Sequence, residues 1–388
     1  MCMLCDQARG QRFVSGEYND RRALYGLSIA PAELLDNDSV AYTQWSTATD
    51  GVLDYYLHTP GGEVVVFGGG FGEQSIQSVA ISQADQNYFN AMVRRLDSIL
   101  ELDFRQVGNA DSADVDLYYD TVIDVGGGGN TLGLATTSGR GGWELFVNYP
   151  EVEFDEAYRR YVLVHEFGHS LGLEHPFEAG DGDAVKGITD PWLSAYPEDT
   201  VMAYRNPSSG TWPDFFTTND LNALIAVWGA ETRLFGDDRD FVTGAAYRDI
   251  LLGAGGDDEL RGWRGADRVE GGLGNDQVMG GDGADDLLGG AGDDAIFGGY
   301  GHDTINGGSG TDQIRGGFGG DLFLISSGQD VIEDFRLTEN DQLGLRSGID
   351  FELQQQGNDL QVITSLGTTT LWGVDLGSFL VQDRVVTV

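Results

Sequence analysis

The eleven residues H-E-F-G-H-S-L-G-L-E-H, which begin at His165, combine metal-binding side chains with a candidate general base. His165 and His169 are four residues apart, so on one helix they project side by side and can share one metal ion. Glu166 can reach a water molecule at that ion. Gly172 can adopt the left-handed conformation that ends a helix, which allows His175 to approach as a third nitrogen ligand. Three imidazoles suit Zn²⁺ and leave one coordination position open, as in catalytic zinc sites.

The spacing of these histidines is specific. The chain has five histidines in 388 residues, and three of them fall in this stretch. The alternative is a helix that carries histidines by chance, but Glu166 and Gly172 are in register with them. The stretch resembles the extended zinc signature of the metzincin metallopeptidases, H-E-x-x-H-x-x-G-x-x-H. That family also has a methionine turn, which the segment D-T-V-M-A-Y around Met202 resembles.

Within that family the sequence resembles the serralysin branch. The resemblance rests on Pro176, which follows the third histidine, and on Tyr204, two residues after Met202. Serralysins are secreted bacterial proteases with calcium-binding repeats. The resemblance implies that Met202 forms a hydrophobic floor under the histidines. It also implies that Tyr204 binds zinc in the resting enzyme and moves to stabilise the oxyanion. Thr200 and Ala203 stand in this turn where serralysins usually have serines.

The charge of the chain restricts its partners. It has 22 Lys and Arg against 63 Asp and Glu, a formal net charge of −41. Such a charge destabilises a compact fold by self-repulsion unless cations neutralise it. We therefore exclude nucleic acid as a partner and expect bound divalent metal. The sequence contains no apolar run of about 18 residues, so no membrane-spanning segment is predicted.

A nine-residue unit, G-G-x-G-x-D-x-U-x with U apolar, repeats nine times from Gly244 to Leu324. This pattern matches the calcium-binding nonapeptide of parallel β-rolls. The glycines permit tight turns with inward carbonyls, and each Asp adds a charged oxygen, which suits Ca²⁺. In the first units Ala245, Tyr247, Ala254 and Trp263 replace glycines, so these turns are expected to bind weakly or to act as a cap. The expected calcium ligands are Asp258, Asp267, Asp276, Asp285, Asp294, Asp303, Asp312 and Asp321.

Ahead of the repeats, the pattern predicts strands, a long helix from Ser82 to Leu102, further strands and then the zinc helix from about Asp155. By the resemblance, Leu132 to Thr136 lies near an edge strand that pairs with an extended peptide substrate. The predicted fold is an α+β metzincin zinc-protease domain followed by an all-β parallel β-roll of RTX repeats.

Residues 1–45 are polar, are expected to be irregular, and occupy the place of a serralysin pro-segment. Cys2 and Cys5 are the only cysteines, so no disulfide framework is expected. Three readings of this pair stay open: a reduced exposed pair, a strained local disulfide, or a thiolate that occupies the open zinc position and keeps a zymogen latent. The N-terminus lacks the apolar run of a secretory signal peptide. The residues from Gln382 to Val388 resemble an uncleaved signal for type I secretion.

The expected domains are a pro-segment (1–45), a catalytic domain (46–232), and an RTX roll with the secretion-signal region (233–388). The expected function is that of a secreted, monomeric endopeptidase with one catalytic Zn²⁺ and several structural Ca²⁺. Its partners would be an extended polypeptide substrate and the type I secretion machinery. Two alternatives stay open: a calcium-dependent binding or adhesion protein with an inactive protease domain, and a zinc hydrolase of another substrate such as a peptidoglycan cross-link.

Overall fold

The computed structural model describes residues 2–3, 29–68, 72–121, 132–175, 195–203, 206–382 and 385–387. The chain forms two compact units, Met1–Gly229 and Ala230–Val388. We call them the first unit and the roll unit. No helix among the described residues is both long and apolar enough to cross a membrane.

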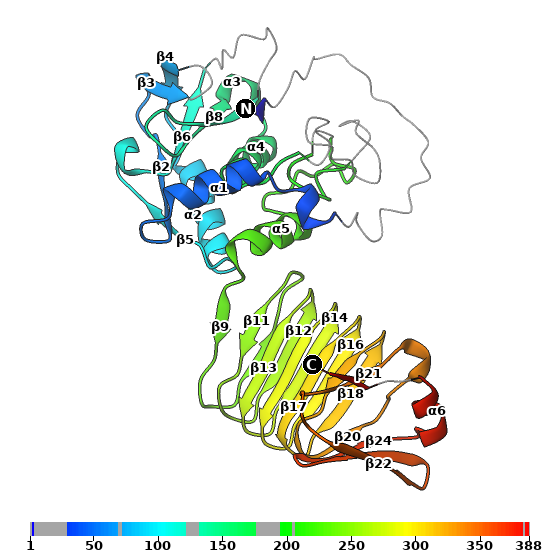
Figure 1. The fold of residues 1–388 in the computed structure, drawn as a ribbon. Coiled ribbons are helices and arrows are strands. Elements are labelled where there is room, and N and C mark those ends of the chain that lie inside the picture. Colours follow the sequence, from blue (N-terminus) through cyan, green and yellow to red (C-terminus); the bar gives the residue numbers. More distant parts are fainter. Residues whose placement is uncertain are drawn as a thin grey trace, which may run out of the picture. The chain divides into compact units, whose positions relative to one another are not determined.

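The first unit is a mixed sheet with helices (Figure 1). Its strands are β1 (Cys2–Met3), β2 (Val52–Leu57), β3 (Gly62–Gly68), β4 (Gly72–Val79), β5 (Asp103–Gln106), β6 (Val115–Asp120), β7 (Gly133–Thr137) and β8 (Trp143–Asn148). Its helices are α1 (Asn37–Ser46), α2 (Gln83–Asp97), α3 (Tyr149–Val152), α4 (Glu156–Ser170) and α5 (Thr218–Trp228), with short 3₁₀ turns η2 (Pro31–Glu33) and η3 (Ala110–Ser112).

The sheet order is β1-β7-β8-β6-β2-β5, and the β3–β4 hairpin joins it because β4 also pairs with β6. Strands β8, β6, β2 and β5 are parallel, whereas β7 runs antiparallel to β8. Helix α4 packs against β7 and β8. This contact places the stretch that starts at His165 next to the strand predicted to bind substrate.

Part of the segment expected to be irregular is helical. Asp36 caps α1 by accepting hydrogen bonds from the backbone N–H groups of Asp38 and Ser39. Thr43, on this helix, donates to the Ser170 carbonyl at 2.7 Å and accepts from the Trp143 indole at 2.8 Å. Helix α1 is therefore part of the first unit. The sequence pattern did not reveal this helix because it has no apolar stripe, and polar tertiary contacts hold it instead.

A pair of buried carboxyl groups lies between β6 and β8. Asp116 and Glu144 face each other in the register of these parallel strands, and they are 4% and 0% exposed. Glu144 accepts the Phe67 N–H at 2.9 Å, whereas Asp116 Oδ1 has no hydrogen-bond partner. Burial, followed by repulsion from Glu144, raises the pKa of Asp116 to about 8. His58 is also buried, and its ring packs against that of Tyr118.

The roll unit is a stack of parallel strands that alternate between two faces (Figure 1). These strands are β9 (Thr232–Leu234), β10 (Phe241–Thr243), β11 (Ile250–Leu252), β12 (Glu259–Arg264), β13 (Arg268–Leu273), β14 (Gln277–Asp282), β15 (Asp286–Ala291), β16 (Ala295–Tyr300), β17 (Thr304–Gly310), β18 (Gln313–Phe318), β19 (Leu322–Leu324), β20 (Ser327–Ile332), β21 (Gln342–Leu345), β24 (Gly367–Leu371) and β25 (Val385–Thr387). The rest of the unit comprises the antiparallel pair β22 (Phe351–Gln356) and β23 (Asp359–Thr364), the turn η4 (Leu337–Glu339) and helix α6 (Leu376–Gln382).

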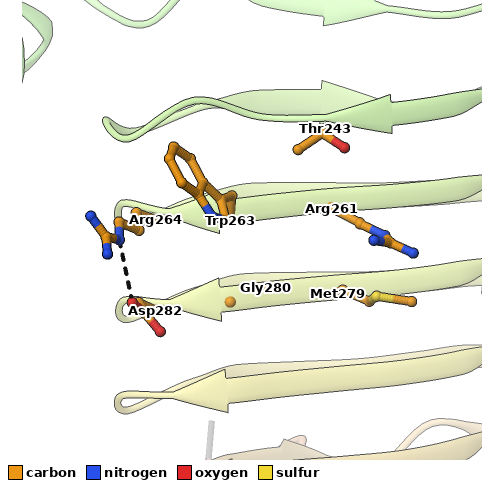
Figure 2. Close-up of a pocket in the computed structure, with 8 residues that line it drawn as sticks. Thr243, Arg261, Trp263, Arg264, Met279, Gly280 and Asp282 are labelled. Carbon is orange, nitrogen blue, oxygen red and sulfur yellow. Dashed lines mark ion pairs between the residues drawn. The ribbon is translucent and has the colours of Figure 1, made fainter.

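From β9 to β21 each strand pairs in parallel with the strand after next, so even-numbered strands form one face and odd-numbered strands the other. The apolar residue of each repeat points inward and is 2% exposed or less: Leu251, Leu260, Val269, Val278, Leu287, Ile296, Ile305, Ile314 and Phe323. Figure 2 shows side chains on the outer surface of β12 and β14. The sequence predicted an α+β domain followed by an all-β parallel β-roll, and the structure confirms this fold class with a mixed α/β unit and a parallel β-roll.

The buried carboxyl pair predicts a pH-dependent stability. The raised pKa of Asp116 means that the folded chain keeps this proton while the unfolded chain loses it near pH 4, so the stability is highest below that pH and falls as the pH rises towards 8. Asp116→Asn removes the ionisation and keeps the shape. We expect it to raise the free energy of unfolding more at pH 8.5 than at pH 5.5, by about 2–3 kcal/mol.

Chemical unfolding of the calcium-loaded chain at both pH values measures this difference. Asp103→Asn is the matched control, because Asp103 is an exposed aspartate of the same sheet, on β5. A gain from Asp116→Asn that is equal at both pH values would contradict the assignment.

Candidate functional site

Helix α4 carries the first two histidines and the glutamate. It begins after Asp155, whose side chain accepts the Tyr158 N–H at 3.0 Å, and it ends at Ser170. Gly172 follows with φ +101°, the left-handed conformation expected of it. A Cβ at Gly172 would overlap the side chain of Val40 on α1, so glycine is required here for space as well as for the turn.

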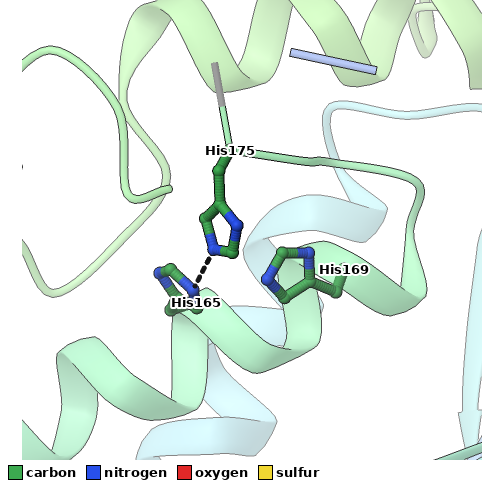
Figure 3. A group of neighbouring side chains, drawn as sticks. All are labelled: His165, His169 and His175. Atoms are coloured by element: carbon green, nitrogen blue, oxygen red, sulfur yellow. Dashed lines mark hydrogen bonds between the residues drawn. The ribbon is translucent and has the colours of Figure 1, made fainter. Parts of the chain in front are cut away.

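The turn brings His175 back to the two histidines of α4 (Figure 3). His165, His169 and His175 are 0%, 6% and 1% exposed, and one nitrogen of each lies within 4.8 Å of the others. The Nε2 atoms of His165 and His175 are 3.1 Å apart, and the His169 Nε2 has no hydrogen-bond partner. Among the described residues this is the only such group of three metal-binding side chains.

Backbone carbonyls select the tautomers of two of these rings. The His165 Nδ1 lies 2.7 Å from the Val201 carbonyl, and the His169 Nδ1 lies 2.7 Å from the Leu173 carbonyl. A carbonyl only accepts, so both Nδ1 atoms carry the proton and both Nε2 atoms present a lone pair. Burial, with the nearby His175, lowers the pKa of both rings well below the usual range, which keeps them neutral. Neutral buried imidazoles with converging lone pairs fit a zinc ion.

Glu166 lies next to this group and is fully buried. Neither carboxylate oxygen has a hydrogen-bond partner, and burial raises the pKa of Glu166 well above its usual range. A Cβ at Gly133 would overlap the Glu166 carboxylate, so β7 passes directly over this side chain. Strand β7 pairs with β8 along one edge and with β1 along its other edge. The pairing with β1 is antiparallel, with Cys2 opposite Ala135 and Met3 opposite Leu134. The glutamate thus lies beneath a strand that accepts an added strand.

The turn that contains Met202 packs against α4. Met202 is fully buried, and a Cβ at Gly168 would come within 3.2 Å of its sulfur, so the second variable residue of H-E-x-x-H must be small. Asp220, on α5, holds this turn by accepting from the Thr200 hydroxyl at 2.5 Å and the Val201 N–H at 2.9 Å. Sequence reasoning missed Asp220; its only signal is its position as N3 of the α5 capping box.

Several residues singled out in the sequence lie outside the described residues. Tyr204 and Cys5 are among them, as are Asp383, Arg384 and Val388 of the C-terminal segment expected to be a secretion signal. Cys2 lies in β1, whose backbone pairing alone is described. The roles proposed for Tyr204, Cys2 and Cys5 therefore stay predictions.

In the roll unit, the eight aspartates expected to bind calcium share one environment. Each Oδ1 accepts the backbone N–H of the residue 18 positions earlier, as Asp285 does from Asp267 at 2.8 Å. Each Oδ2 is buried without a hydrogen-bond partner. A Cβ at Gly280 would overlap the Asp285 Oδ2 and lie 2.7 Å from the Gly298 carbonyl oxygen, so carboxylate and carbonyl oxygens converge. Such an oxygen-lined position fits Ca²⁺.

Burial weakens the acidity of these aspartates. Burial raises the pKa of Asp267 and Asp294 to about 7, and that of Asp285, Asp303 and Asp321 to about 6. A buried carboxylate without a partner is unfavourable, and a cation removes that penalty.

The row of aspartates has protein partners at both ends. Asp249 Oδ1 forms an ion pair with Arg233 at 2.6 Å, and its Oδ2 accepts the Ala245 N–H. At the other end Asp330 and Asp341 continue the row, because they accept from Asp312 and Asp321, and their second oxygens accept from Ser326 and Arg336. The roll therefore extends beyond the repeats from Gly244 to Leu324. The sequence did hold a signal, since Asp330 and Ile332 keep the nine-residue spacing.

A protein-family model agrees with this reading of the roll unit. The model of the RTX calcium-binding nonapeptide repeat (4 copies) matches residues 236–269, 264–296 and 288–323. The chain thus carries RTX calcium-binding repeats.

Similarity to whole proteins is distant and partial. A serralysin of Photorhabdus luminescens is 34% identical over 91 residues, which are 21% of this chain and 18% of that protein. A serralysin of Proteus mirabilis is 34% identical over 92 residues, 21% of this chain and 18% of that protein. The match thus spans about a fifth of the length of these curated relatives.

Two solved structures also show partial similarity. Extracellular lipase LipA from Serratia marcescens has a TM-score of 0.20 and 22% identity over 41% of each chain. The AlgE6R3 subunit of the Azotobacter vinelandii mannuronan C5-epimerase has a TM-score of 0.20 and 21% identity over 40% of this chain and 82% of that one. At this TM-score neither structure bears on the fold or activity of this chain.

The environments of the aspartates predict which of them bind calcium. Asp285→Asn removes charge from a buried oxygen with no protein partner, so we expect fewer bound Ca²⁺ ions and a severalfold higher calcium concentration for half-maximal folding. Asp249→Asn is the matched control, because Arg233 already neutralises that carboxylate. Calcium-dependent circular dichroism and the calcium content after dialysis measure both effects. Equal losses in the two variants would show that partner-free oxygens do not mark the sites.

Proposed function

We propose that this chain is a secreted, calcium-dependent zinc endopeptidase. The observation that carries the proposal is the buried histidine group of His165, His169 and His175 beside the buried, partner-free carboxylate of Glu166. A purely structural zinc site has four protein ligands and needs no carboxylate beside it. A buried glutamate without a partner destabilises the fold, so its presence favours a catalytic role over a binding protein with an inactive domain.

Each side chain has a role in this proposal. The three histidines hold Zn²⁺, which when bound polarises the scissile carbonyl and acidifies a water molecule. Glu166 accepts a proton from the attacking water and then returns it to the leaving amine. Tyr204 is proposed to donate a hydrogen bond to the oxyanion.

The proposed substrate is an extended polypeptide. Its backbone would pair antiparallel with β7, where Gly133 lies over Glu166. Support comes from β1, which uses this side of β7 through the pairs Cys2–Ala135 and Met3–Leu134. This edge therefore has the geometry for an added antiparallel strand.

The RTX repeats support secretion through a type I system. Eight buried carboxylate oxygens without partners oppose folding of the roll where free calcium is scarce. Calcium outside the cell would then drive folding after export. We therefore propose that the chain is secreted by a type I system, folds in calcium after export and acts as a monomer.

The central test is Glu166→Gln, which keeps the size of the side chain and removes its basicity. We expect casein hydrolysis in calcium to fall by at least about 100-fold while the zinc content stays near one per chain. His169→Ala is the companion variant and should lose both zinc and activity. Hydrolysis that persists in Glu166→Gln would rule out the proposed base. Peptidoglycan is assayed in parallel, and hydrolysis of it without casein cleavage would favour a cross-link hydrolase.

We propose further that the N-terminal segment keeps the protease latent. It pairs with the substrate edge through β1, and its Cys2 or Cys5 thiolate would occupy the open zinc position. The removable part would end before Ile29, because Ile29 is 3% exposed and its N–H donates to Asn219 at 3.2 Å. This proposal shortens the pro-segment expected at residues 1–45.

The latency proposal has its own test. Replacing Cys2 and Cys5 by Ser should release protease activity in the full-length chain at least tenfold, and alkylating the wild-type cysteines should do the same. A chain cleaved before Ile29 serves as the fully active reference. If the double variant stays as latent as the wild type while the cleaved chain is active, a thiolate does not bind the zinc.

A further inference from the structure

Trp263 occupies a backbone position that suits glycine. Its φ is +82°, and in the register of the even face it lies beside Gly281, which has φ +117°. A side chain with a Cβ in this region costs about 1–2 kcal/mol, and a bulky one is an outlier. The indole is nevertheless 52% exposed, so burial does not repay this strain. Backbone strain of this kind is concentrated at functional sites.

The indole lines a pocket of about 490 Å³ on the outer surface of the roll (Figure 2). Arg264 lies beside it, with the guanidinium 5.3 Å from the indole centre. Arg261, Met279 and Gly281 also line the pocket. The pocket thus combines an exposed aromatic face, two guanidinium groups, an apolar thioether and the carboxylate of Asp282.

The features of this pocket continue along the even face. One row of side chains in register consists of Arg261, Met279, Phe297 and Arg315. A second row consists of Arg264, Asp282, Tyr300 and Phe318. Between them runs a line of glycines, Gly281, Gly299 and Gly317, with Trp263 at one end. We call this feature the roll groove.

Aromatic rings extend the groove beyond the pocket. Tyr300 and Phe318 are stacked with their ring centres 5.1 Å apart, and they are 60% and 56% exposed. Neighbouring strands lie about 4.8 Å apart, so four strands present contacts over roughly 15 Å. This length suits several units of a polymer better than one small molecule.

The odd face lacks such rows. Its equivalent positions hold Glu270, Leu288 and Asn306 in one row and Leu273, Ala291 and Ser309 in the other. The repeat pattern therefore does not require aromatic and arginine side chains here, and they distinguish one face of the roll.

The pocket has two guanidinium groups that suit an anionic ligand. The chain has a net charge of −41, yet two arginines meet here, with side chains 51% and 61% exposed, and each already pairs with an acidic side chain. Arg261 pairs with Glu259. Arg264 pairs with Asp282 at 3.5 Å, and both side chains are largely exposed, so the pair contributes little and can exchange for a ligand. A guanidinium binds a carboxylate with two hydrogen bonds.

The backbone excludes recognition of a peptide by strand addition. Strand β12 pairs with β10 and β14, and β14 pairs with β12 and β16, so neither offers a free edge. Contacts in the roll groove must come from side chains. Flat indole and phenyl rings present apolar faces, which suit the C–H faces of sugar rings.

We propose that the roll groove binds a polysaccharide whose rings carry carboxylate groups. Sugar rings would stack on Trp263 and on the Tyr300–Phe318 pair, while Arg261 and Arg264 bind carboxylates. This inference goes beyond the proposed peptidase function and does not depend on it. Binding of this kind would hold the protein on an acidic polysaccharide surface.

The test uses the full chain in calcium with hexamers of polygalacturonate, hyaluronan and chondroitin as probes, and a neutral dextran hexamer as reference. Calorimetry measures the affinity for each. We expect at least one uronate hexamer to bind the wild type and dextran to bind at least tenfold more weakly. Trp263→Gly should weaken uronate binding at least tenfold without lowering the unfolding midpoint, because it restores glycine at a positive φ. Arg264→Gln should also weaken binding.

Leu273→Ala, at an exposed strand end of the odd face, is the matched control and should keep wild-type affinity. The proposal is overturned if no uronate hexamer binds, or if Trp263→Gly binds as tightly as the wild type. It is also overturned if the wild type self-associates in light scattering and Trp263→Gly alone abolishes this, since the groove would then be an interface between copies.

Discussion

Eight carboxylate oxygens lie buried in the roll without a hydrogen-bond partner. The stacking of the parallel strands is what brings these oxygens into the interior. The same turns that stack the apolar residues from Leu251 to Phe323 into a narrow core bring the aspartates inward. Burying one unpaired carboxylate is unfavourable, and a row of them opposes the hydrophobic gain of the core. Cations resolve this conflict. On the proposal that calcium drives folding, folding of the roll and calcium binding are one equilibrium.

The two ends of the roll meet the same constraint without a metal ion. At one end the guanidinium of Arg233 takes the place that a cation would have at Asp249. At the other, Ser326 and the Arg336 backbone satisfy Asp330 and Asp341. A stack of identical calcium-binding turns would leave its terminal carboxylates half coordinated, and these protein partners complete them. Trp263 differs from these end residues, because its strained backbone does not provide a partner for any buried group of the roll.

In the first unit, the buried atoms that need a partner outside the protein are histidine nitrogens. Backbone carbonyls of Val201 and Leu173 fix the protons of His165 and His169 on Nδ1, so that lone pairs converge. The close packing of Gly168, Met202 and Asp220 holds the turn that supplies one of these carbonyls. Glu166 is buried beside them without a partner, and this is the feature that a metal and a water molecule would satisfy. Both units are therefore built around atoms whose partners are not protein.

The sequence alone determined the features that depend on local spacing. The four-residue step from His165 to His169 places both on one helix face, and Gly172 must end that helix because only glycine tolerates its φ beside Val40. The nine-residue period likewise determined the strands and inward aspartates of the roll. Tertiary structure decided what depends on contacts distant in sequence. Helix α1 has no apolar stripe and is held by Ser170 and Trp143, the passage of β7 over Glu166 depends on sheet order, and the roll groove exists only because residues 18 apart lie side by side. Periodicity reports the local conformation of a chain, whereas these features follow from which distant segments pack together.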